Sequence, residues 1–252
     1  MLSEIKGDLK VLNENLIHAI KTGAMPAFEQ ALSRSASVEA TDQYSNTALM
    51  IAVGEQHLPM TERLIAAGAN LNALSEFCPQ SALHIAARHD SLEMTELLLK
   101  HGAELHIWSR RCQTPLHVAC KAGKMTQVRL LLDHGARETQ GPDTSFDSAF
   151  IAALVAGHFD IASYLLVRKP ELFKDGDSYG LYPLQRFAYW KSHVLVAWLL
   201  DQPMPDWLKL DSAYFRDAAA SAVEELADYE QGDDYEAARA ATMELFRARG
   251  YL

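Results

Sequence analysis

A short phrase recurs along the chain at intervals of 33 or 34 residues, and this recurrence constrains the fold more than any other feature. The clearest copy is Thr114-Pro115-Leu116-His117-Val118-Ala119, and weaker copies in the same phase begin at residues 14, 47, 81, 148 and 182. A fixed step of this length predicts a stacked array of similar small units, in which each unit contacts only its neighbours. Such arrays usually present a surface, which favours a binding protein over an enzyme.

The best-defined unit, residues 109–140, predicts two short antiparallel helices. Thr114 can cap the first helix, and Pro115 suits the first helical position because its missing N–H is not needed there. Gly123 is expected to end this helix. A leucine-rich second helix follows and should stop at Gly135, which takes a left-handed conformation. Two such helices cannot hide their apolar faces alone, so neighbouring units must stack about 8–10 Å apart.

The phrase and the leucine-rich second helix resemble the ankyrin repeat family over roughly residues 14–205. The resemblance implies an all-α fold, an ankyrin-repeat solenoid of stacked helix-turn-helix units with short β-turn fingers. It also implies that His84 and His117 are structural residues that tie adjacent turns together. The chain departs from the pattern at the ends of the second helices of three units, where Ser35, Lys169-Pro170 and Pro203-Met204 replace the expected glycine.

The chain is expected to have three parts. Residues 1–13 predict an N-terminal capping helix, residues 14–205 six ankyrin repeats, and residues 206–252 an acidic C-terminal helical cap. Between residues 211 and 236 there are nine acidic residues against one base, Arg216. A solvated face of the cap explains this charge, and the alternative is a docking element for a basic partner.

The resemblance places partner binding at the fingers, at the ends of the first helices and at the links between repeats. In this chain, large rings occupy such positions where solvent is expected: Tyr44, Phe77, Trp108, Tyr179, Tyr189 and Trp190. Cationic or titratable side chains occupy others in the central repeats: Arg88, His89, Arg110, Arg111 and Lys121. Because aromatic residues and arginine supply most interface hot spots, we expect a basic, aromatic groove for a protein partner. The alternative for any one ring is packing against a neighbouring finger.

Other kinds of site find little support. The net charge of −10 disfavours a sequence-independent grip on nucleic acid. No pair of histidines has the spacing of a zinc site, so we expect no metal and no cofactor. Neither a nucleophile elbow nor a phosphate-binding loop is present, so we expect no catalytic residues. Cys78 and Cys112 lie on adjacent fingers, too far apart for a disulfide, and Cys120 replaces a core alanine, so all three should be free thiols.

Composition narrows the setting. An odd number of cysteines, three, indicates a reducing compartment, and the first residues lack the apolar core of a secretory signal. No apolar stretch is long enough to span a membrane. We therefore expect a cytoplasmic monomer, although leaderless secretion would leave no such signal. The leading function is a stoichiometric binder: an inhibitor, an immunity-like antidote to a toxin, or an adaptor. The alternative is a delivered bacterial-type effector whose repeats address a target and whose acidic C-terminal helices dock.

Overall fold

The computed structural model describes residues 2–77, 79–109, 113–138 and 148–174, together with residues 197, 198, 201, 237, 240, 241, 243, 244, 247 and 248. The chain divides into two compact units, residues 1–138 and 139–252. In the described part, the secondary structure is helical apart from an isolated antiparallel bridge between Thr41 and Thr47. The structure confirms the predicted all-α solenoid of stacked helix pairs.

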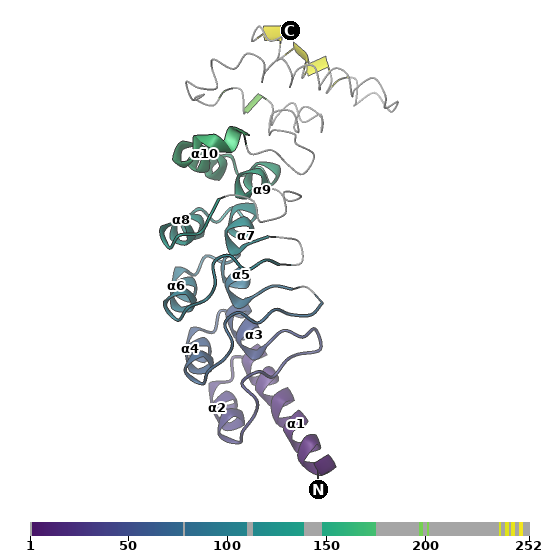
Figure 1. Cartoon of the computed structure of the whole chain (residues 1–252). Helices are drawn as coiled ribbons and strands as arrows, with labels where there is room; N and C mark the ends of the chain where they lie inside the picture. Colours follow the sequence, from purple (N-terminus) through teal and green to yellow (C-terminus); the bar gives the residue numbers. More distant parts are fainter. Residues whose placement is uncertain are drawn as a thin grey trace. The chain divides into compact units, whose positions relative to one another are not determined.

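The described part of the first unit contains four successive helix pairs in two columns, and all of these helices are short except α1 (Figure 1). The inner column contains the first helix of each pair, and in this column α3 contacts α1 and α5, and α5 contacts α7. The outer column contains the second helix of each pair. The inner helices are α1 (Leu2–Lys21), α3 (Ala48–Gly54), α5 (Ala82–Ala86) and α7 (Pro115–Lys121), and the outer helices are α2 (Met25–Ser33), α4 (Leu58–Ala66), α6 (Leu92–Lys100) and α8 (Met125–Asp133).

The core lies between successive pairs and repeats with the sequence phrase. In each of the five copies that the structure describes, the third residue of the phrase lies in the core and is at most 1% exposed: Leu16, Leu49, Leu83, Leu116 and, in the second unit, Phe150. Each second helix adds a residue that is completely buried: Phe28, Leu64, Leu98, Leu131 and Leu165. Burying one such side chain contributes about 1.5–3 kcal/mol, so the periodic apolar positions account for the stacking.

The N-terminal segment and the first predicted repeat share one helix. Helix α1 runs through the boundary expected between the capping helix (1–13) and the repeat that begins at residue 14. The sequence around this boundary contains no proline or glycine that would end a helix, which explains the continuity. Its second half buries Leu16 and Ile20 in the stack, whereas Leu9 in the first half is 42% exposed.

The described part of the second unit contains the fifth helix pair. Helix α9 (Ala149–Val155) packs against α10 (Phe159–Arg168), and a 3-10 helix, η1 (Pro170–Lys174), follows and contacts α10. Helix α10 ends at Arg168, and Lys169 is its C-cap, because Pro170 cannot continue the helix. The ring of Trp198 lies 5.4 Å from that of Phe159, centroid to centroid. Apart from residues 197, 198 and 201, the sixth predicted repeat lies outside the described residues, as do residues 206–236 of the predicted C-terminal cap.

Most outer helices end in the left-handed conformation that the glycines predicted. Gly68, Gly102 and Gly135 have φ of 89°, 91° and 94°, respectively. Ser35 takes the same place after α2 with φ of 71°. A residue with a Cβ pays a steric cost in this region, so the first repeat keeps the family's geometry at the expense of strain.

We expect Ser35→Gly to raise the free energy of unfolding by about 0.5–1 kcal/mol, because relief of the left-handed strain exceeds the entropic cost of glycine. The reverse change, Gly102→Ser, should lower it by a similar amount, and no atom lies within 4 Å of the Cβ that it would introduce. Urea denaturation of both variants checks the pair. Equal stability of Ser35→Gly and the native chain would contradict the assignment of strain to Ser35.

Candidate functional site

Three hairpin fingers precede α3, α5 and α7 and project from the inner column on the side away from the outer helices (Figure 1). A backbone hydrogen bond closes each finger at its base. The N–H of Asp42 donates to the carbonyl of Asn46 over 3.0 Å, that of Ser75 to Gln80 over 3.4 Å, and that of Ser109 to Gln113 over 3.0 Å. The second finger contains one more residue between its closing pair than the others, which explains the 34-residue step between the copies at 47 and 81.

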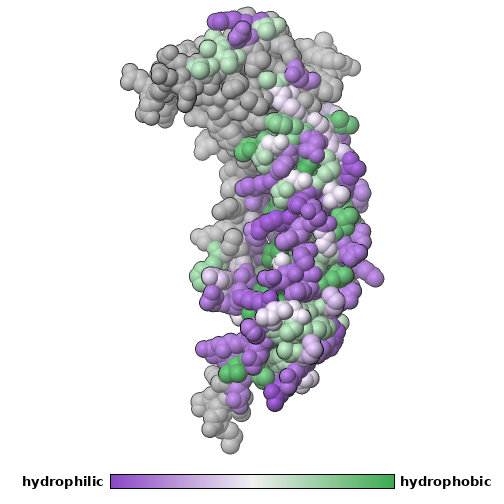
Figure 2. Space-filling model, turned by 180° about the vertical axis from the view of Figure 1, so that it is seen from behind, coloured by the Kyte–Doolittle hydropathy of each residue, from purple (hydrophilic) through white to green (hydrophobic). Residues whose placement is uncertain are grey.

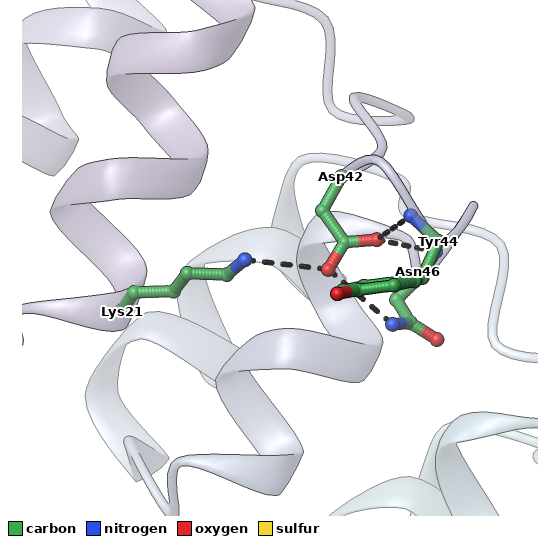
Figure 3. A network of polar contacts seen from close by, with 4 residues as sticks. All are labelled: Lys21, Asp42, Tyr44 and Asn46. Atoms are coloured by element: carbon green, nitrogen blue, oxygen red, sulfur yellow. Dashed lines mark hydrogen bonds and ion pairs between the residues drawn. The ribbon is translucent and has the colours of Figure 1, made fainter.

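A carboxylate inside the turn fixes the first finger (Figure 3). Oδ1 of Asp42 accepts hydrogen bonds from the backbone N–H groups of Tyr44 over 2.9 Å and Asn46 over 3.0 Å. Oδ2 accepts from Nδ2 of Asn46 and from Nζ of Lys21 at the end of α1, both over 3.3 Å. The Asp42 side chain is only 6% exposed. The first finger is therefore tied both to itself and to the helix beside it.

These contacts favour the charged form of Asp42. Burial alone would raise the pKa of this carboxyl, but the hydrogen bonds from Asn46, Tyr44 and Lys21 outweigh it and hold the pKa below its ordinary value. The fold therefore gains stability from the carboxylate above its ordinary pKa and loses it as the pH falls through the lowered value.

The fingers carry apolar side chains into solvent. Tyr44 is 57% exposed at the first finger, and Phe77 is 65% exposed at the second. Leu74, which begins the second finger, is 41% exposed. The hydroxyl of Ser45 donates to Oε2 of Glu76 over 3.2 Å, so the two fingers are also joined to each other. Exposed apolar groups on braced turns are typical of a binding surface.

The described members of the predicted cationic or titratable set lie at the ends of α5 and α7. Arg88 is exposed and donates from Nη2 to Oε1 of Gln80, at the base of the second finger, over 3.1 Å. His89 is partly buried, and its backbone carbonyl accepts from Nε2 of Gln127 over 3.0 Å. Lys121 is exposed. Arg88 therefore presents positive charge beside the second finger and Lys121 at the end of α7, whereas His89 contributes to the stack.

Among the predicted rings that the structure describes, Trp108 differs from Tyr44 and Phe77 because it packs against a buried side chain. It is partly buried, and its ring centroid lies 5.9 Å from that of the buried His117, with the planes tilted by 54°. This contact is with helix α7 and not with a neighbouring finger, which was the alternative that the sequence left open for each ring. Tyr179, Tyr189, Trp190, Arg110 and Arg111 lie outside the described residues.

His84 links two repeats, as the resemblance implied. Its Nδ1 accepts the backbone N–H of Ser81 over 3.2 Å, so the ring proton is on Nε2, which donates to the carbonyl of Gln113 over 2.8 Å. Burial lowers the pKa of this imidazole, the charge of Arg88 lowers it further, and the Gln113 hydrogen bond opposes both. His117 repeats the first half of this arrangement, with Nδ1 3.3 Å from the backbone nitrogen of Thr114.

Other side chains of reactive types in the described residues, one cysteine and two histidines, have structural roles. The thiol of Cys120 is completely buried, as predicted, and burial raises its pKa. His101 and His134 lie at the ends of α6 and α8, and each bonds through Nδ1 to a helix carbonyl over 2.9 Å. In the described ranges, no group of three His, Cys, Asp or Glu side chains could hold a metal ion. Nor does any helix there have the length and apolarity to cross a membrane.

The reverse face of the first unit contrasts with the fingers. Figure 2 shows this face covered mainly by hydrophilic residues, with hydrophobic residues singly or in small groups. On the outer helices, ion pairs join successive repeats: Arg63 Nε lies 2.7 Å from Glu29 Oε1. A comparable pair, Lys124 Nζ to Asp90 Oδ2 over 2.6 Å, lies where α8 begins. These exposed pairs suit a solvated surface.

Leu74 is the finger residue that the sequence reasoning missed. It follows the second helix of its repeat by several residues, in the register where Thr41 and Trp108 begin the other fingers. An apolar side chain at that register was a usable signal, because Trp108 had already been singled out there.

A comparison of the sequence with models of known families agrees with this fold. The model of a family described as ankyrin repeats (3 copies) matches residues 16–109 and again residues 83–172, which together cover more than half of the chain. A search of curated proteins gives no match.

Replacing Asp42 should loosen the first finger. We expect Asp42→Ala to lower the free energy of unfolding by about 1.5–3 kcal/mol, because hydrogen bonds to a charged acceptor are lost. Asp42→Asn keeps an oxygen for the two backbone donors and should cost less. Thermal unfolding ranks the variants, and equal losses would show that the turn hydrogen bonds contribute nothing.

Protonation of His84 should weaken the fold in mild acid. Because its pKa is lowered in the folded chain, the unfolded chain binds more protons, and stability must fall as the pH drops through about 6.5. We expect the unfolding free energy of His84→Gln to depend less steeply on pH between 7.5 and 5.5 than that of the native chain. His106→Gln, at an exposed position, serves as the control. An unchanged slope in His84→Gln would contradict the prediction.

Proposed function

Because the chain belongs to the ankyrin repeat family, we propose that it binds another protein through the fingers and first-helix ends of its array. Ankyrin repeats are general modules of protein–protein interaction. The proposed surface consists of the finger residues Tyr44, Leu74 and Phe77, the helix-end residues Arg88 and Lys121, and the partly buried Trp108.

One observation carries the proposal: large apolar residues are exposed on fingers that the rest of the fold braces. Other exposed apolar residues, such as Leu9 on α1 and Val167 on α10, lie on helix surfaces. Tyr44 is 57% exposed, although the backbone of its turn is held by Asp42, and Phe77 is 65% exposed on a finger bonded to Ser45 and Arg88. A pre-ordered turn loses little conformational entropy when a partner binds, so the exposed rings retain more of their burial energy as affinity.

The finer role that we favour is a stoichiometric binder without catalytic activity, acting as an inhibitor, an immunity-like antidote or an adaptor. The family is typically non-enzymatic, and in the described repeats the buried His84, His117 and Cys120 take part in hydrogen bonds and packing that hold the fold. Such a binder acts by occupying a surface of its partner, which requires affinity and shape but no reactive group.

A second role, a delivered effector, is favoured by the charge of the C-terminal segment. The nine acidic residues between 211 and 236 hold most of the chain's net charge of −10. Replacing these acids with their amides distinguishes the two roles. A binder that uses only its repeats keeps its affinity for the partner, whereas an effector that docks through the acidic helices loses its effect.

We expect Tyr44→Ala and Phe77→Ala each to weaken partner binding by more than about 1 kcal/mol, with unchanged thermal stability, because both remove exposed area rather than core. The partner is recovered with the native chain from the source cell, purified and titrated calorimetrically against each variant. Leu9→Ala, which truncates an exposed leucine on α1, is the control. If neither finger variant loses more affinity than Leu9→Ala, the finger surface is the wrong assignment.

A further inference from the structure

We propose that the second finger (residues 74–80) and the ends of α5 and α7 recognise a partner segment in which a carboxylate lies close in sequence to a large apolar side chain. This inference rests on the proposed function and deepens it, because it names the chemistry that the partner must present.

The apolar half of the surface is the second finger. Phe77 and Leu74 are 65% and 41% exposed, on a turn closed by the hydrogen bond from Ser75 to Gln80. The extra residue in this finger distinguishes it from the fingers before and after. A bulky aliphatic or aromatic side chain of the partner could bury both residues at once.

The charged half adjoins the same turn. Nη2 of Arg88 bonds to the side chain of Gln80, and the backbone carbonyl of Gln80 closes the finger. The acceptor of Arg88 is thus a neutral amide, whereas Arg63, Lys21 and Lys124 each pair with a carboxylate. A guanidinium held this way has further N–H donors for a planar carboxylate, the group that its geometry fits best.

Charge changes sign along the helix ends, which gives the surface a direction. Glu55 caps the end of α3, Arg88 follows α5, and Lys121 ends α7, and all three are exposed. Helices α3, α5 and α7 pack in this order. A partner carboxylate is therefore attracted toward α5 and α7 and repelled at α3.

Nucleic acid fits the same cations less well. Glu76 lies within the second finger, Glu55 lies one repeat away, and the chain carries a net charge of −10. A phosphate backbone needs a run of neutralising contacts, and these carboxylates interrupt it. An isolated carboxylate next to an apolar side chain needs only one cation and one apolar surface.

The test uses the whole chain and peptides of random sequence. Twelve-residue peptides displayed on phage are selected on the native protein, and the tightest is synthesised with a fluorescent label for anisotropy titration. We expect selected peptides to carry Asp or Glu within two positions of Phe, Leu, Ile or Trp. Arg88→Glu should lower the affinity for the labelled peptide about tenfold or more, because repulsion between two carboxylates replaces a charge-assisted hydrogen bond. A peptide in which Lys replaces the acidic residue should bind the Arg88→Glu variant more tightly than it binds the native chain.

Two variants separate recognition from general effects. Arg34→Glu makes the same charge change at an exposed arginine after α2 and should alter affinity less than twofold. Gln80→Ala removes the hydrogen-bond acceptor of Arg88 but leaves the charge of Arg88 in place. It should therefore lower the affinity for the peptide less than Arg88→Glu does. Thermal unfolding confirms that each variant is folded.

Several outcomes would overturn the inference. They are an absence of selected peptides, selection without acidic residues, equal losses in Arg88→Glu and Arg34→Glu, equal losses in Arg88→Glu and Gln80→Ala, and displacement of the peptide by an equal concentration of single-stranded DNA. The broader proposal fails separately. If Phe77→Ala lowers the affinity for the cellular partner and Arg88→Glu does not, the protein still binds through its fingers, but it does not recognise a carboxylate of the partner.

Discussion

The structure depends on one constraint, namely that no helix pair in it can bury its own apolar face. Inner helices such as α5 and α7 have five and seven residues, and helices this short are not stable alone in water. Stacking supplies what each pair lacks: Leu83 and Leu116 are at most 1% exposed in an array where α5 contacts both α3 and α7. Polar ties follow the same direction: the imidazole of His84 reaches from one repeat to the carbonyl of Gln113 in the next.

Because stacking occupies the core positions, the fingers are free to differ. Asp42, Ser75 and Ser109 occupy the same register and make the same closing hydrogen bond, yet only Asp42 adds a carboxylate that fixes the turn. The second finger has an added residue, and it depends on Ser45 and Arg88 for its support. Arg88 therefore serves two purposes, since it holds the finger that carries Phe77 and keeps donors available at the surface.

Much of the fold could be predicted because its determinants are local and periodic. The glycines after the outer helices, the Thr114–Pro115 start of α7 and the buried Cys120 all follow from residue chemistry at one register. The continuity of α1 did not follow, because a boundary drawn from the repeat phase need not interrupt a helix that has no breaking residue. Ser35 illustrates the opposite case: the repeat imposes a left-handed turn on a residue that does not favour it.

The candidate site was less predictable than the fold. Tyr44, Phe77, Arg88 and Lys121 are exposed in the described fingers and helix ends, but Trp108 is partly withdrawn against His117, and Leu74 escaped notice. By itself, the sequence determined the repeat, its family and the core, because apolar periodicity and helix ends depend on residues near one another in the chain. Only the tertiary structure decided which side chains remain in solvent and which brace the fingers. Contacts such as that of Lys21 with Asp42, or of Ser45 with Glu76, join residues that become neighbours only once the repeats have stacked.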